Sequence, residues 1–138
     1  MSWAAYAVIS ALFAAATAIL AKIGIAGVPS TLATAIRTVV VLLFAWGMVF
    51  LTGEQRMLAT VSRRSLLFLC LSGVATGASW LAYFRALQLG PASRVAPVDK
   101  LSLAFTVVLA AVLLHEPVTL RLAAGVGLIV AGVLLTLH

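Results

Sequence analysis

The sequence predicts an all-α membrane protein, a bundle of five transmembrane helices with almost no soluble part. Hydrophobic residues make up 64% of the 138-residue chain and charged residues only 9%. A soluble domain of this length needs about a quarter charged residues on its surface. The hydrophobic residues also occur in runs close to the roughly 20 residues with which a helix crosses the hydrocarbon core of a bilayer.

Five such runs are separated by short polar or Gly- and Pro-containing connections, and we expect them to form one domain covering residues 1–138. The predicted helices span approximately residues 3–22, 31–52, 65–87, 95–115 and 119–137. The fourth run is the least regular. Its uncharged part is short, so a full crossing has to begin near Val95 and draws Asp99 and Lys100 toward the membrane.

The basic residues at the ends of these runs bear on the orientation of the chain. On the N-terminal side they are Arg56, Arg63, Arg64 and Arg121; on the other side they are Lys22, Arg85 and Arg94, joined by Arg37 and Lys100 if these reach that face. Lys22, Arg85 and Arg94 are expected to extend to the lipid headgroups. The side of a membrane protein that carries more Lys and Arg usually faces the cytoplasm. Because the two sides carry nearly equal numbers here, the count permits both orientations of the chain.

Several helices are predicted to carry a polar or small-residue face. The third has Ser72, Thr76, Ser79 and Tyr83 along one stripe, and the last has Gly125, Gly127, Ala131 and Gly132. The stripe either lines a shared cavity or bonds to the backbone of its own helix. The small residues favour close packing, within the bundle or between subunits.

Ionisable and aromatic residues within the spans are candidates for binding a substrate or a coupling ion, because charges at membrane depth are costly and usually functional. The candidates are Arg37, Thr76, Trp80, Tyr83, Asp99 and Lys100. Asp99 is the acid that fits a proton-coupling role; alternatively, Asp99 and Lys100 are a buried pair that fixes the register of their helix. Neighbours on a helix point about 100° apart, so each of the two is expected to have a different partner. Trp80 and Tyr83 either stack on a substrate or anchor a span end at the interface.

Nothing in the sequence predicts an enzyme. It has no Ser/His/Asp arrangement, no set of His and Cys residues with metal-ligand spacing and no phosphate-binding loop, so no catalytic residue, metal or cofactor is expected. The nine basic residues are scattered among hydrophobic runs and do not predict nucleic-acid binding.

Two long segments resemble the EamA domain of the drug/metabolite transporter superfamily: AILAKIGIAGVPSTLATAIRTVVVLLFAW and WLAYFRALQLGPASRVAPVDKLSLAFTVVLAAVLLHEPVTLRLAAGVGLIVAGVLL. The resemblance implies a multi-pass protein of the plasma (inner) membrane with a small-molecule substrate. Most family members join two five-helix halves in inverted orientation, so the resemblance makes this chain one half and implies an antiparallel homodimer in the lipid bilayer. The last helix also resembles the dimerising helix of small multidrug resistance proteins, but the first helix lacks that group's glutamate.

The leading hypothesis is therefore a secondary transporter that exports a small polar or amphipathic metabolite and works as an inverted homodimer by alternating access. The excess of basic groups favours anionic or zwitterionic substrates. The alternative is a non-transporting membrane subunit, such as a component of a lipid-linked-sugar flippase or an accessory partner of another membrane protein. An ion channel is less favoured, because no ring of charges or carbonyl filter is evident.

Overall fold

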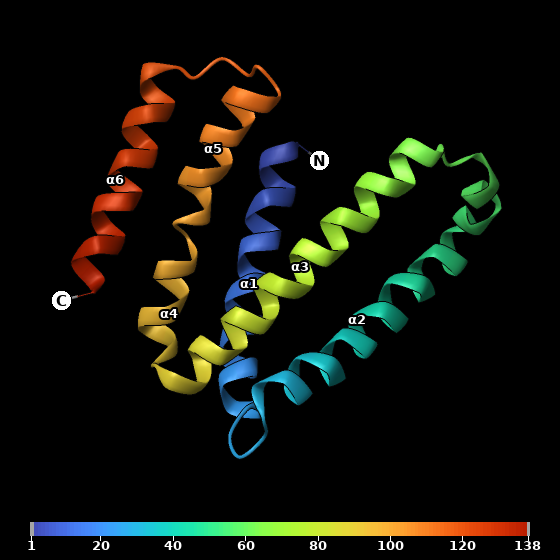
Figure 1. Cartoon of the computed structure of the whole chain (residues 1–138), viewed down its shortest axis with the longest axis horizontal. Coiled ribbons are helices and arrows are strands. Elements are labelled where there is room, and N and C mark those ends of the chain that lie inside the picture. Colours follow the sequence, from blue (N-terminus) through green and yellow to red (C-terminus); the bar gives the residue numbers. More distant parts are fainter. Residues whose placement is uncertain (1, 138) are drawn as a thin grey trace. The chain divides into compact units, whose positions relative to one another are not determined.

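The computed structural model describes residues 2–137, and within this range it is helical with no β-strand. The elements in order are α1 (Trp3–Gly24), α2 (Ser30–Thr52), the 3₁₀ helix η1 (Glu54–Thr60), α3 (Arg63–Leu89), α4 (Ala92–Asp99), α5 (Ser102–Leu113) and α6 (Leu120–Thr136) (Figure 1). The all-α class predicted from the sequence is confirmed.

Four helical stretches of the described chain are long and apolar enough to cross a membrane. They are α1, α2, α3, and α4 with α5 taken together as Ala92–Leu113. The remaining apolar helix, α6, has 17 residues and is about 25 Å long, against roughly 30 Å for the hydrocarbon core. Length and composition thus support four spans, and a fifth span at α6 stays a prediction.

The helices present apolar side chains outward along most of their length. Leu12 on α1 is 67% exposed, Phe44 on α2 is 72% exposed and Leu128 on α6 is 75% exposed. In water, so much contiguous apolar surface would drive aggregation. A lipid bilayer covers it, which fits a multi-pass membrane protein.

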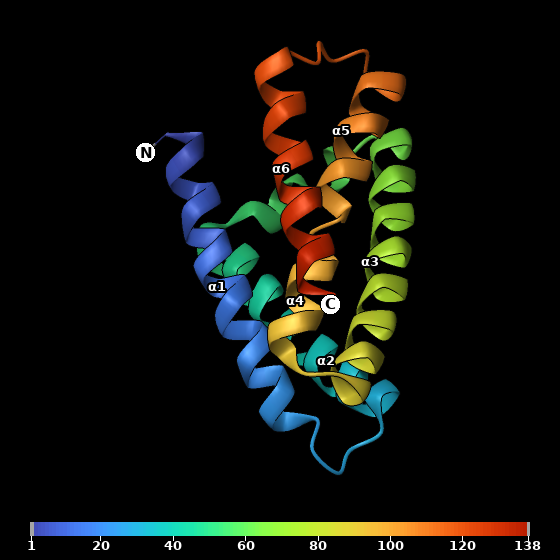
Figure 2. The ribbon, with the colours of Figure 1, turned by 90° about the vertical axis from the view of Figure 1, so that its left-hand side faces the viewer.

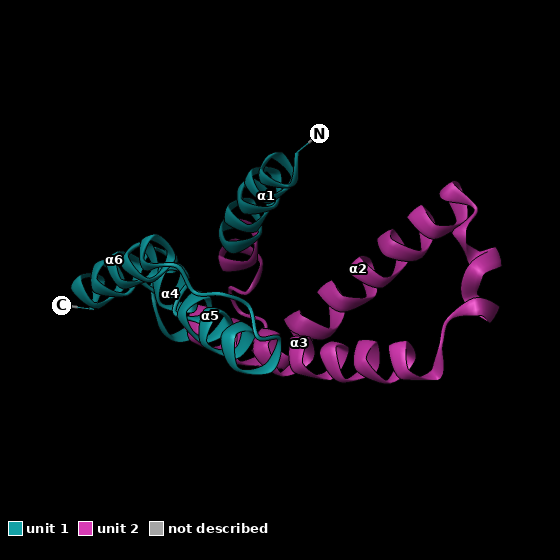
Figure 3. Ribbon diagram, turned by 90° about the horizontal axis from the view of Figure 1, so that it is seen from above, with its two compact units in different colours: residues 1–19, 89–138 teal, residues 20–88 magenta. Residues whose placement is uncertain are grey.

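The chain forms two compact units, residues 1–19 with 89–138 and residues 20–88 (Figure 3). In the first unit, α6 lies alongside α4 and α5 (Figure 1 and Figure 2). In the second unit, α2 and α3 run antiparallel. They are closest where α2 begins and farther apart toward η1 (Figure 3).

The core of the second unit lies at the end where α2 and α3 approach each other. Its buried residues are Ile25, Thr34, Phe84 and Leu87. Thr34 is the polar member, and its hydroxyl donates to the carbonyl of Ser30 at 2.9 Å. A buried hydroxyl that bonds within its own helix avoids the cost of an unpaired polar group.

A lysine from α1 completes the end of α3. In a continuing helix the carbonyl of Leu87 would accept from residue 91, but Pro91 has no N–H. Lys22 Nζ donates to this carbonyl instead, and Leu87 is fully buried. Gln88 adds a second link, from Nε2 to the carbonyl of Val28 at 2.8 Å. Lys22 thus holds the α1–α2 connection against the end of α3, which revises the expectation that it extends to the headgroups.

The fourth span is divided, whereas the sequence predicts one helix over residues 95–115. Pro97 lies inside α4, where its ring and its missing N–H disturb the helical hydrogen bonds. The N–H groups of Lys100 and Leu101 then bond three residues back, to Pro97 at 2.9 Å and Val98 at 3.0 Å. This tight 3₁₀ turn separates α4 from α5 and leaves neither backbone N–H unpaired.

Replacing Lys22 with Met is expected to destabilise the second unit by about 1–2 kcal/mol, because the buried carbonyl of Leu87 loses its donor. Thermal unfolding of the purified protein in detergent measures the effect. The matched control is Arg63→Met at the exposed first residue of α3, which should unfold like the wild type. Equal stability of Lys22→Met and wild type would contradict the capping role.

Candidate functional site

Three of the predicted site residues come together in the second unit. Arg37 on α2 places its Cζ atom 4.1 Å from the ring centroid of Trp80 and 5.5 Å from that of Phe84, both on α3. Tyr83 lies within electrostatic range of Arg37. A cation over an aromatic face at these distances is an attractive cation–π contact. We refer to Arg37, Trp80, Tyr83 and Phe84 as the arginine–aromatic cluster.

Helix geometry explains how α3 supplies three members of this cluster. Positions three and four residues apart lie on the same helix face, so Tyr83 and Phe84 accompany Trp80 one turn later. Phe84 is 3% exposed and belongs to the core, whereas Trp80 and Arg37 are half-buried. The cluster therefore rests on the packed end of the unit on one side and remains accessible on the other.

Phe84 is the member of the cluster that the sequence analysis missed. Its spacing from Trp80 was a usable signal, but an apolar residue at helical spacing more often marks a core than a site. In this structure Phe84 serves both purposes, since it is buried and also contacts the guanidinium.

Thr76 stands apart from the cluster in its contacts. Its hydroxyl donates to the carbonyl of Ser72 at 2.9 Å, and the residue is exposed. Thr106 makes the same bond to Ser102 at 2.8 Å. Both hydroxyls bond to the backbone of their own helix, which is the second of the two interpretations of the polar stripe. A role for Thr76 in binding a substrate stays a prediction.

Asp99 and Lys100 form an ion pair with each other in the first unit. Lys100 Nζ lies 3.2 Å from Asp99 Oδ2, with the side chains 50% and 39% exposed. The expectation that each has a different partner is wrong in this structure. It assumed a regular helix, but α4 ends at Asp99, and Lys100 at φ −71° and ψ −7° departs from α-helical geometry. The 100° rotation between neighbours on a regular helix therefore does not apply to Asp99 and Lys100, and their side chains reach each other.

The small residues of α6 are unpacked in the single chain. A Cβ atom added at Gly125, Gly127 or Gly132 would meet no atom within 4 Å, and Ala131 is exposed. Gly125 and Gly132 share one face of α6, and Gly127 and Ala131 share another. Both faces are therefore open to lipid or to another protein surface, and packing through them stays a prediction.

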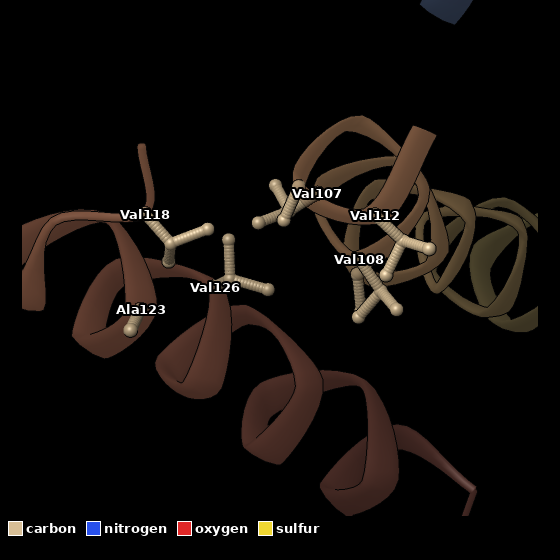
Figure 4. Close-up of a pocket in the computed structure, with 8 residues that line it drawn as sticks. Val107, Val108, Val112, Val118, Ala123 and Val126 are labelled. Atoms are coloured by element: carbon tan, nitrogen blue, oxygen red, sulfur yellow. The ribbon is translucent and has the colours of Figure 1, made fainter. Parts of the chain in front are cut away.

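A pocket of about 340 Å³ lies between α5 and α6 (Figure 4). It is lined only by alanine and valine: Ala104, Val107, Val108, Ala111, Val112, Val118, Ala123 and Val126. A solute site usually combines apolar walls with a few polar groups that fix orientation. This pocket has no such group, and none of the predicted site residues lines it.

Within residues 2–137 there is no group of three or more His, Cys, Asp or Glu side chains that could hold a metal ion. The arginine–aromatic cluster also has no metal ligand of these types. Its chemistry is that of a fixed cation beside aromatic rings, which suits the binding of an organic molecule.

Apolar helices of membrane-spanning length define a multi-pass membrane protein, and two of these helices carry a charged and aromatic cluster. The chain belongs to the EamA-like transporter family, which it matches over residues 1–138. The family resemblance drawn from the sequence is thereby confirmed.

Two relatives carry transporter names. A Sinorhizobium protein described as an uncharacterized transporter in the cobO 3′ region is 50% identical over 134 residues, covering 97% of this chain and 95% of the relative. The uncharacterized transporter YvbV of Bacillus subtilis (strain 168) is 41% identical over 71 residues, covering 51% of this chain and 23% of the relative. No solved structure matches the chain. Family and relatives support the function of a membrane transporter.

A double-mutant cycle tests the contact between Arg37 and Trp80. The variants Arg37→Met and Trp80→Leu are each expected to destabilise the protein. The double variant should lose about 0.5–1 kcal/mol less than their sum, because the cation–π contact is lost only once. Thermal unfolding in detergent gives the four stabilities. The parallel cycle of Arg85→Met with Trp80→Leu should be additive, since Arg85 bonds to Gln88; additivity in both cycles would refute the contact.

Proposed function

We propose that this membrane protein is a secondary transporter that exports a small polar or amphipathic metabolite across the plasma membrane. The arginine–aromatic cluster is the observation that carries the proposal. It combines a guanidinium, which attracts the polar part of a solute, with ring faces that accept an apolar part. Both helices of the cluster are long and apolar enough to span a membrane, and charges at that depth commonly line substrate paths.

Asp99 is proposed to couple transport to protons. Its carboxylate is partly exposed and lies beside Lys100, at the turn that separates α4 from α5. Discontinuous helices in secondary transporters often carry substrate or coupling-ion sites. Lys100 balances the charge of the deprotonated carboxylate, and Tyr83 and Thr76 contact the solute from α3.

The working unit is proposed to be an inverted homodimer that functions by alternating access. Three features support this. The basic residues are nearly balanced between the two sides of the membrane. A fifth span at α6, which is part of this proposal, gives an odd number of crossings. The open face of α6 that carries Gly125 and Gly132 allows close approach of a second chain.

Transport is tested in proteoliposomes loaded with a defined mixture of amino acids, organic acids and amines, with mass spectrometry as the readout. An imposed proton gradient should move at least one solute faster than in protein-free liposomes. Asp99→Asn should lower that rate about tenfold or more, a barrier increase of at least roughly 1.4 kcal/mol. Glu116→Gln, an exposed acid between α5 and α6, is the matched control and should retain the rate.

An Asp99→Asn variant with the wild-type rate and pH dependence would remove the coupling role. Movement of solute only after a second membrane protein is added would favour the accessory-subunit alternative.

Cysteine crosslinking tests the inverted dimer. In a Cys70→Ala background, Gly125→Cys and Gly132→Cys variants place a thiol near opposite ends of the small-residue face, about 10 Å apart along α6. Disulfides need Cα atoms within about 7 Å, so an antiparallel pair should crosslink only when the two variants are co-expressed. Crosslinking of each variant with itself, together with a single orientation of a reporter fused after residue 138, would contradict the inverted arrangement.

A further inference from the structure

The charge of Arg37 is not balanced within its own unit. Residues 20–88 contain one acid, Glu54 in η1. It lies beyond the end of α2 at Thr52, which is itself about 22 Å from Arg37 along the helix axis. In the other unit, Asp99 is paired with Lys100. Arg37 therefore holds a positive charge within a membrane-spanning helix with no carboxylate of its unit against it, and such a charge usually has a partner.

The geometry of the contact leaves the hydrogen-bonding edges of the guanidinium available. Within residues 2–137, the contacts found for this guanidinium are those of the arginine–aromatic cluster. Neither ring carries a carbonyl or carboxylate oxygen, so the five N–H donors of the guanidinium are left for an acceptor of that kind. The neighbouring hydroxyls of α2 donate to backbone carbonyls, Thr34 to Ser30 and Thr38 to Thr34 at 2.8 Å, and within residues 2–137 neither accepts a hydrogen bond from the Arg37 guanidinium.

The missing component of this site is an anionic acceptor. A guanidinium binds a carboxylate through two parallel hydrogen bonds, and the complex of one Arg with one carboxylate is neutral. A phosphate dianion would leave net charge in the membrane, and an amine would be repelled by Arg37. The rings of Trp80 and Phe84 beside the guanidinium suit an apolar group attached to the carboxylate.

We propose that Arg37 binds the carboxylate of the solute and that Trp80 takes the apolar part of the same molecule. This rests on the proposed transport function and names its substrate class: monocarboxylates with an apolar or aromatic body. Phe84 holds the guanidinium in place from the buried side, and Tyr83 lies beside the same charge.

The test uses the fluorescence of Trp80, which lies close enough to Arg37 to report on its ligand. The chain has three tryptophans, so Trp3→Phe and Trp46→Phe leave Trp80 as the reporter. The probes are benzoate, its neutral analogue benzamide and the cation benzylamine, titrated at millimolar concentration into the purified protein in neutral detergent. Benzoate should change the emission saturably, whereas benzamide and benzylamine should not.

Arginine variants in the same background assign the effect to one residue. Arg37→Gln should weaken benzoate binding about tenfold or more, and Arg37→Lys should weaken it less, because Lys keeps the charge without the paired donors. The matched control is Arg85→Gln, one residue after Phe84 on an exposed position, which should bind like the background. If Arg37→Gln does not fold, the Arg37→Lys and Arg85→Gln pair still decides the assignment.

Three results would overturn the proposal: no saturable response to benzoate, an equal response to benzamide, or undiminished benzoate binding in both Arg37 variants. The outcome is separable from that of the transport test. Saturable benzoate binding without solute movement in proteoliposomes would leave the anion site standing and count against transport by this chain alone. Solute movement with no preference for carboxylates would leave the transporter standing and remove the anion site.

Discussion

In a lipid bilayer every backbone N–H and C=O group has to be paired inside the protein, and the rest of this structure depends on that constraint. The helices satisfy most of these groups themselves. A backbone carbonyl loses its helical donor at two prolines, Pro91 after α3 and Pro97 inside α4. At Pro91 a lysine of another helix supplies the missing donor to Leu87. At Pro97 the chain tightens into a 3₁₀ turn.

These two solutions also determine where the candidate functional groups lie. The bond from Lys22 joins the α1–α2 connection to the end of α3, next to the buried Phe84. The approach of α2 to α3 at this end is what brings Arg37 over Trp80. At the second proline, the turn releases Lys100 from helical geometry and lets it meet Asp99. A backbone requirement thus underlies both charged features of the protein.

Features that depend on one run of residues could be predicted from the sequence, whereas contacts between distant residues could not. Composition and run length indicate whether a chain folds in water or in lipid, so the all-α membrane class followed from the residues. The family followed from the resemblance of two long segments to the EamA domain. The pairing of Lys22 with Leu87 joins positions 65 apart in the chain, and no periodicity within one helix reports on that. The contact of Arg37 with Trp80 also joins two different helices, so it could not be predicted from the sequence, although both residues were candidates for the site. Separate partners were expected for Asp99 and Lys100 because the end of α4 was taken as regular helix, and the alternative of a pair was expected to be buried, whereas the observed pair is partly exposed.

The arrangement of Arg37 also bears on how a transporter can discriminate. A cation that was fully paired with a carboxylate of the protein would have little differential affinity for a solute, since binding would first require that pair to break. Arg37 instead rests on rings, and a cation–π contact is worth only about 0.5–2 kcal/mol. Those rings can hold the guanidinium in position while its hydrogen-bonding edges remain for an incoming anion. Binding then adds a charge-assisted bond without removing one, and a solute without a negative charge gains none of it.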